Sequence, residues 1–149
     1  MNKDELKKFL IKAKREGYAS GETTTKKEND GSNSTRCEIG DFKFHDNWFG
    51  GEPFAGREVV WFKNKPYWMM VYSGEEFAGD EKAIPTLRKA LSAMPDEMPT
   101  RGPRILEDGE YTYKNNWQGD IEKFSGEESI SKSGEKVYNA RYIGGLVDQ

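Results

Sequence analysis

The chain has 149 residues, enough for one domain with a substantial hydrophobic core, and 13% of them are aromatic. Its net charge of −3 at pH 7 argues against general nucleic-acid binding, which needs a basic surface, so no direct contact with nucleic acid is expected. The single cysteine, Cys37, and the single histidine, His45, exclude an intramolecular disulfide and the usual Cys/His zinc site, and no cofactor is indicated.

The N-terminal segment predicts an amphipathic helix and not a leader or a membrane anchor. Its first residues are polar or charged, and no long apolar run follows, so we expect a cytoplasmic protein without membrane contact. The apolar residues that recur at helical spacing are Leu6, Phe9, Leu10 and Ala13. This spacing predicts a helix over residues 3–16, with Gly17 as its stop.

A polar segment and three strands are expected next. Residues 20–35 contain no apolar side chain that can offset the entropy of ordering them, so a mobile loop is predicted. Residues rich in aromatic and β-branched side chains then predict strands at 37–48, 58–62 and 67–72. The segment 63–66 between the last two is typical of a hairpin turn.

The second half of the chain repeats this order. A helix is indicated by Ile84, Leu87, Leu91 and Met94, with Asp80 as a cap and Pro85 in its first turn. A rigid turn at 99–104 follows, and then three strands are predicted at 109–117, 124–132 and 136–143. Ser133-Gly134 is the expected turn of the last hairpin.

The two halves can be aligned, which predicts an internal duplication. Residues 40–50 and 109–119 both read glycine, acid, aromatic, any residue, aromatic, and later Asn-Trp-x-Gly. The alignment continues after one inserted residue. Pseudo-repeats at about residues 3–74 and 80–145 would form a single α+β domain of (αβββ)2 order, with two helices packed on an antiparallel sheet or half-barrel.

The two copies are unequal. Residues 59–62 and 67–72 of the first copy are almost continuously apolar, whereas residues 129–132 and 137–142 of the second copy alternate polar and apolar. A strand that is apolar on both faces is covered on both faces. A central sheet position beneath a helix, a subunit partner and a ligand are three alternative covers, and the sequence leaves them open.

Glu58 is the acid that the sequence singles out, because it begins this apolar hairpin among aromatic residues. A carboxylate beside aromatic faces can hold an organic cation by charge pairing and cation–π attraction, although a salt bridge to Arg57 or to a lysine of a neighbouring strand is the alternative. Two arginines in the 99–104 turn can clamp an anion or cap loop carbonyls. The candidate ligand-binding residues are Glu58, Trp48, Trp61, Trp68, Tyr72, Arg101 and Arg104.

Several of these segments together resemble an uncharacterised domain family of bacteria and archaea. The resemblance rests on residues 8–14 with Tyr18-Ala19, and on residues 40–44, 54–58, 101–103 and 109–113. Domains of that family occur alone or behind the helix-turn-helix of transcription regulators, which implies a sensing role but no activity and no catalytic residues. Because no helix-turn-helix is recognised here, the resemblance does not imply DNA binding. By architecture alone, the predicted fold is also similar to gyrase-inhibitor-like effector-binding domains, which hold aromatic cations against a buried acid.

Three hypotheses for function follow. The first is a non-enzymatic effector-binding or sensor domain for a small aromatic or cationic ligand. The second is an interaction module in which the apolar first hairpin forms a homodimer. The third is a small carboxylate-dependent enzyme, in which paired acids such as Glu58 and Glu128 act with His45 or a tyrosine, although no catalytic motif is visible.

Overall fold

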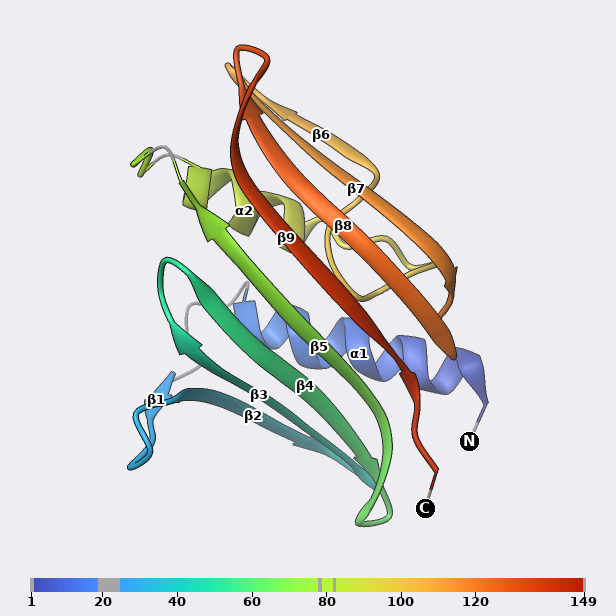
Figure 1. The fold of residues 1–149 in the computed structure, drawn as a ribbon. Coiled ribbons are helices and arrows are strands. Elements are labelled where there is room, and N and C mark those ends of the chain that lie inside the picture. The colour runs from blue at the N-terminus through green and yellow to red at the C-terminus, as the bar shows by residue number, and fades with distance from the viewer. Residues whose placement is uncertain (1, 19–24, 78, 82, 149) are drawn as a thin grey trace.

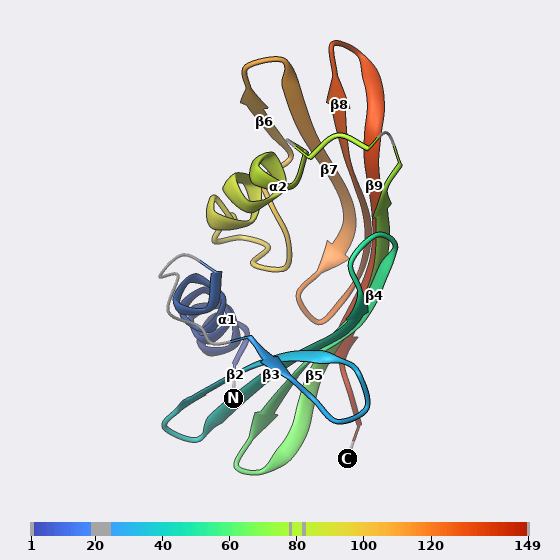
Figure 2. The ribbon, with the colours of Figure 1, turned by 90° about the vertical axis from the view of Figure 1, so that its left-hand side faces the viewer.

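The computed structural model describes residues 2–18, 25–77, 79–81 and 83–148, which form an α+β fold dominated by one sheet. Nine antiparallel strands follow the order β1-β2-β3-β4-β5-β9-β8-β7-β6. Figure 1 shows both helices behind the sheet, and Figure 2 shows the sheet curving around them. The elements are α1 (Lys3–Tyr18), β1 (Lys26–Lys27), β2 (Asn33–Ile39), β3 (Phe42–Gly50), β4 (Phe54–Phe62), β5 (Lys65–Glu76), α2 (Ala83–Ser92), β6 (Ile105–Asp108), β7 (Tyr111–Asp120), β8 (Lys123–Lys132) and β9 (Glu135–Leu146). In the described part of the chain, no helix is both long and apolar enough to cross a membrane.

Helix α1 begins at a reciprocal cap and buries its apolar stripe. The Asn2 side chain accepts a hydrogen bond from the backbone N–H of Glu5 at 2.9 Å, and the Glu5 carboxylate accepts one from the N–H of Asn2 at 2.9 Å. The stripe residues Leu6, Phe9, Leu10 and Ala13 are all buried. The predicted helix is therefore confirmed, but it continues through Gly17 to Tyr18 instead of stopping there.

Helix α2 is shorter than its apolar pattern indicates. Pro85 lies in its first turn as predicted, where a missing backbone N–H costs little. The helix ends at Ser92, so Met94 is buried in the loop that follows and does not belong to the helical stripe. The buried residues of the helix are Ala83, Thr86, Leu87 and Ala90.

Each half of the sheet contains a meander of four strands, which corrects the predicted three. The strand expected over 37–48 is two strands, β2 and β3, joined by a turn at Gly40. Gly40 has a φ of 58° and Gly109, between β6 and β7, has a φ of 64°. These left-handed backbone conformations favour glycine, so each glycine forms a tight turn between two strands. The aromatic residues that follow each glycine made the turn look like the beginning of a single strand.

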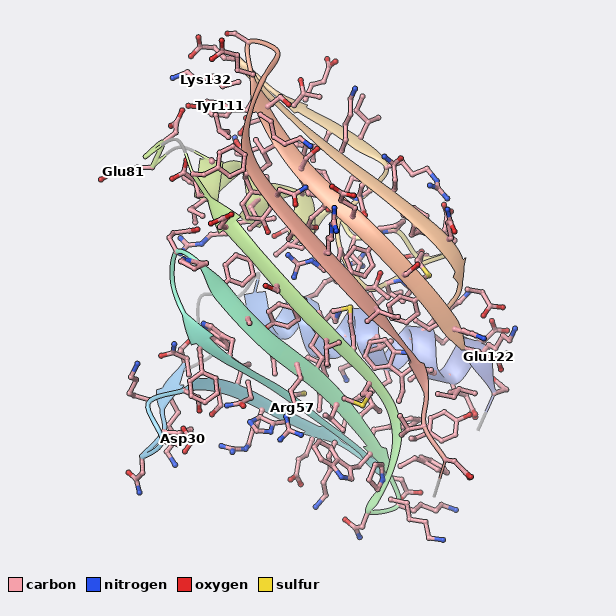
Figure 3. The ribbon with its side chains drawn as sticks, in the orientation of Figure 1. Asp30, Arg57, Glu81, Tyr111, Glu122 and Lys132 are labelled. Atoms are coloured by element: carbon pink, nitrogen blue, oxygen red, sulfur yellow. The ribbon has the colours of Figure 1, made fainter. Side chains whose placement is uncertain are left out.

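The segment predicted as a mobile loop over 20–35 also contains strands. Strand β1 and the first residues of β2 lie within it, and residues 20–24 are outside the described part of the chain. Residues 33–36 are polar, yet they pair with β3, because backbone hydrogen bonds form a ladder without apolar side chains. In the β1–β2 turn, Asp30 (Figure 3) accepts a hydrogen bond from the Ser32 N–H at 3.0 Å.

The two halves meet at the centre of the sheet, where β5 pairs with β9. The turns beside these strands are Lys63-Asn64 and Ser133-Gly134, and all four residues have positive φ, as a two-residue hairpin turn of type I′ requires. The predicted turn at 133–134 is confirmed, and the one at 63–66 narrows to 63–64, since Pro66 already belongs to β5.

Helix α1 covers the surplus apolar surface of the first hairpin. Val60, Trp68 and Met70 are completely buried and belong to the same core cluster as the stripe of α1. A second cluster lies beneath α2, and its large members are Leu87, Tyr111, Tyr113, Ile130 and Tyr138. The sequence left three explanations open for the apolar surface of this hairpin. On the concave face the first applies, because the hairpin lies in the sheet beneath a helix.

Candidate functional site

Five charged side chains of the described chain are buried, and they lie together on the concave face between the two helices. They are Lys14, Asp46, Glu58, Arg101 and Glu128, from α1, β3, β4, the α2–β6 loop and β8. A buried charge is costly unless a partner compensates it. The concentration of five such groups in one place marks the region as a candidate site.

Glu58 is paired with a residue of helix α1. Its Oε2 lies 2.6 Å from the Nζ of Lys14, and the same Nζ donates a hydrogen bond to the Thr100 carbonyl at 2.6 Å. Burial lowers the pKa of Lys14, and burial raises the pKa of Glu58 to about 7 against the opposing effect of the Lys14 charge. The partner is thus neither Arg57 nor a lysine of a neighbouring strand, which were the residues considered from sequence.

Glu128 is held more tightly than Glu58. Arg101 donates to it from Nε, at 3.2 and 3.1 Å to the two carboxylate oxygens, and also from Nη2. The hydroxyls of Tyr113 and Tyr138 donate to the same carboxylate at 2.6 and 2.9 Å. Burial alone would raise the pKa of Glu128, but the guanidinium and the two hydroxyls outweigh it, so this pKa is lowered. Arg101 therefore binds a carboxylate of the protein itself.

A cleft of about 420 Å³ opens between α2 and strands β3–β5 above this network. The charged residues that line it are Asp46, Glu52, Arg88 and Arg101. Asp46 accepts a hydrogen bond from the Tyr72 hydroxyl at 2.5 Å. The Arg101 guanidinium lies 5.6 Å from the centre of the Tyr72 ring. The apolar residues that line the cleft are Trp48, Phe54, Ile84, Leu87 and Leu91. Mostly apolar walls with a few converging polar groups are typical of small-molecule sites.

The structure brings together three of the seven residues singled out from sequence. Trp48, Tyr72 and Arg101 line the cleft, whereas Glu58 is not among its lining residues. The remaining three lie elsewhere, and each has its own environment. Trp68 is buried in the core and donates from Nε1 to the Ile121 carbonyl at 2.8 Å, Trp61 lines a different pocket, and Arg104 lies 3.6 Å from the centre of the Trp117 ring.

Asp46, Phe54 and Lys14 are the site residues that sequence reasoning missed. Asp46 could have been found, because the aligned position in the second half is Asn115 and a change from amide to acid within a shared motif is a signal. Lys14 follows Leu10 by one helical turn, so a lysine on the buried stripe was also visible. Phe54 was visible only as part of the alignment.

Comparison with known proteins identifies the family but no activity. The family model described as domain of unknown function (DUF5680) matches residues 46–147, which include the cleft-lining residues from β3 to the α2–β6 loop. No curated protein and no solved structure matches the chain. Because the match covers more than half of its length, the chain belongs to the DUF5680 family.

Proposed function

We propose that this domain is a non-enzymatic binding domain for a small, flat organic cation, held in the cleft between α2 and strands β3–β5. Sensing such a ligand is the role that the resemblance to regulator-associated domains supports. The cleft volume of about 420 Å³ suits a ligand of a few fused rings. The acid that faces the ligand is Asp46, and Glu58 supports the site from beneath.

The position of Asp46 carries this proposal. Glu128 pairs with Arg101 and Glu58 pairs with Lys14, and neither of these two carboxylates lines the cleft. Asp46 is buried and lines the cleft. A cationic group that enters the cleft beside Asp46 would be attracted by this carboxylate where little water screens the charge.

The aromatic walls supply the second part of the recognition. Trp48 is half-buried and lines the cleft together with Phe54 and Tyr72. The faces of aromatic rings attract cations and stack on flat molecules, with about 0.5–2 kcal/mol for each cation–π contact. Aliphatic side chains of α2, Leu87 and Leu91, close the opposite wall.

A panel of aromatic cations tests the proposal by tryptophan fluorescence quenching and by isothermal titration calorimetry. We expect at least one cation to bind, and Asp46→Asn to weaken its binding about tenfold or more because one charge is lost. The variant should still fold, since the Tyr142 hydroxyl donates to Asn115 at 2.6 Å just as Tyr72 does to Asp46. Trp48→Leu should also weaken binding.

Trp117→Leu is the matched control, because Trp117 lies under Arg104 and does not line the cleft. Its binding constant should equal that of the parent chain. The proposal fails if no cation in the panel binds. It also fails if Asp46→Asn and Trp48→Leu bind a cation as tightly as the parent does.

An enzyme that uses the paired acids is less well supported. Glu58 and Asp46 lie on the concave face, and side chains alternate along a strand, so His45 points to the convex face, away from them. The histidine and the carboxylates proposed as an acid–base set are therefore on opposite sides of the sheet.

A homodimer is the alternative with its own supporting observation. Val71 and Ile143 lie opposite each other on β5 and β9 and are 42% and 59% exposed. They place an apolar spot at the centre of the convex face. Sedimentation velocity at high protein concentration tests this alternative, and a strict monomer would exclude it.

We also propose that the two halves arose by duplication, as the sequence alignment predicts. Tyr72 pairs with Tyr142 across the central strands, which is where a twofold relation between the halves would place equivalent residues. The β4–β5 and β8–β9 pairs have a bulge at Val60/Trp61 and at Ile130/Ser131, which are aligned positions. The two four-strand meanders, β2–β5 and β6–β9, meet at the β5–β9 pair, which further supports the proposal.

A further inference from the structure

Trp61 and His45, which the cleft does not use, lie together on the convex face of the sheet. They line a pocket of about 290 Å³, and its other lining residues are Arg36, Glu38, Lys43, Phe44 and Asn64. Val59 pairs with His45 across β3 and β4 and precedes Trp61 by two residues. Its side chain is only 6% exposed, although it faces the convex side. Long polar and aromatic side chains therefore cover this part of the sheet, which no helix covers (Figure 2).

Cations gather around His45. Arg36 is its register partner on β2, and Arg57 lies on β4, opposite the second residue after His45 (Figure 3). Arg36 pairs with Glu28 at 2.7 Å, and Lys43 pairs with Glu38 at 3.6 Å across exposed side chains, a weak class of contact. Arg57 makes no ion pair within the described chain. This surface therefore has positive charge that its own acids do not fully balance.

The imidazole of His45 has an unsatisfied atom. Its Nε2 is buried and has no hydrogen-bond partner within the described chain, and an unsatisfied buried polar atom is destabilising. Burial lowers the pKa of His45, and the charges of Arg36 and Arg57 lower it further against the opposing charges of Asp46 and Glu28. An anion bound between the arginines would reverse that effect and supply an acceptor for an imidazole N–H.

The second hairpin has none of these features. The register pair Lys43–Trp61 corresponds to Thr112–Ser131 in β7 and β8, and Asn47–Arg57 corresponds to Asn116–Glu127. The tryptophan is thus replaced by serine and the unpaired arginine by an acid. Since the same scaffold forms without them, the convex residues of the first hairpin are not needed to build the sheet.

We propose that the convex face of β2–β4 is a second ligand site, for a ring-bearing anion of the nucleotide type. Trp61 offers a face on which a base can stack, and Arg36, His45 and Arg57 bind the phosphate above Val59. Residues two apart on one strand are about 7 Å apart, which is close to the span between a base and its 5′-phosphate. The site is independent of the cleft, because the two lie on opposite faces of the sheet.

Isothermal titration calorimetry with AMP, adenosine and inorganic phosphate tests this site. We expect AMP to bind more tightly than either of its parts, because only AMP uses the ring face and the arginines together. Trp61→Ser and Arg57→Glu place the residues of the second hairpin at the matching positions, so both variants should fold. Each should weaken AMP binding about tenfold or more.

Trp117→Leu is the control and should bind AMP as the parent does, because Trp117 lies under Arg104 and does not line this pocket. If AMP does not bind at concentrations up to about 10 mM, the proposal is overturned, because a specific site should bind AMP more tightly than this. Equal affinities for AMP and phosphate would overturn the role of Trp61. Unchanged AMP binding in both Trp61→Ser and Arg57→Glu, with normal thermal melting, would overturn the location of the site.

Discussion

The turns of the β3–β4 and β7–β8 hairpins differ in what lies beneath them. In the second, Ile121 is completely buried in the core cluster that contains the stripe of α1, and its carbonyl accepts the Trp68 N–H. Lys3, the first residue of α1, pairs with Asp120 and Glu122 at 2.8 Å each (Figure 3). In the first turn, residues 51–53 are all exposed and the cleft opens towards α2.

One inserted residue accounts for this difference. Three residues separate Gly50 from Phe54 and four separate Gly119 from Phe124, and the longer turn carries the isoleucine that fills the space beside α1. The comparison teaches that a side chain at a turn decides whether the space between a sheet and its helix becomes core or cleft. The α1 side of the molecule is closed, and the α2 side is open.

Arg101→Met is the change with the largest expected effect, because it removes the buried ion pair beneath the cleft on the α2 side. It leaves Glu128 buried without its cation, which should lower the free energy of unfolding by about 3–5 kcal/mol. Urea denaturation measures it. The double variant Arg101→Met/Glu128→Gln should recover part of the loss, and a double variant no more stable than the single one would contradict this account.

Ile121→Ala breaks the closed side. Removing a fully buried isoleucine side chain should cost about 2–4 kcal/mol, from lost burial and the cavity left behind. Gly51→Ala in the open turn is the matched control, because an added Cβ there meets open space and the expected change is within about 0.5 kcal/mol. Equal stability of the two variants would show that the turns are equivalent after all.

Two of the buried carboxylates, Glu58 and Glu128, should respond to pH in opposite directions. Burial raises the folded-state pKa of Glu58 from 4.5 to about 7, so between these values the folded chain binds more protons than the unfolded chain. This contribution to the free energy of unfolding therefore falls as pH rises from 4.5 to 7. Glu128, whose pKa is lowered, adds stability that is lost only as pH falls below its usual range.

Denaturation curves of Glu58→Gln across this pH interval check that sign. The variant should lose the fall in stability between pH 5 and 7, whereas the parent should show it. Lys14→Gln removes the partner and should steepen the fall, since the Lys14 charge opposes the rise in the pKa of Glu58. An identical pH profile for the parent and Glu58→Gln would contradict the assignment.

Arg104→Gln has the smallest expected effect and sharpens the comparison of two tryptophans. Arg104 covers the ring of Trp117, whereas Trp48 lines the open cleft. Loss of this cation–π contact should lower the free energy of unfolding by about 0.5–1 kcal/mol. The affinity of the cleft for the aromatic cation should not change. A changed affinity would show that Trp117 takes part in the binding.

Much of the local structure could be predicted from the sequence. The stripe of α1, the position of Pro85 in α2 and the turn at Ser133-Gly134 depend on neighbouring residues only, so periodicity and turn chemistry reveal them. The extra strands β2 and β6 were missed for an equally local reason. Strand β2 is mostly polar and β6 has only four residues, and the glycine turn after each was read as the beginning of the next strand.

The candidate site could be predicted only in part. Trp48, Tyr72 and Arg101 were found because aromatic and arginine residues stand out beside an apolar hairpin. Asp46 was not, because an acid on a strand reads as a solvated residue until the strand is known to face the concave side. Trp61 was assigned to the same pocket, although the alternation of side chains along β4 places it on the other face.

An α+β chain with two amphipathic helices, glycine turns and two unequal halves follows from composition and from neighbouring residues alone. Which charges pair and which space stays open depends on the tertiary structure. Lys14 meets Glu58, and Arg101 meets Glu128, because helix and loop cross the concave face of a sheet formed by distant strands. Contacts between distant segments depend on how a sheet curves and how a turn ends, and short-range patterns carry no record of either.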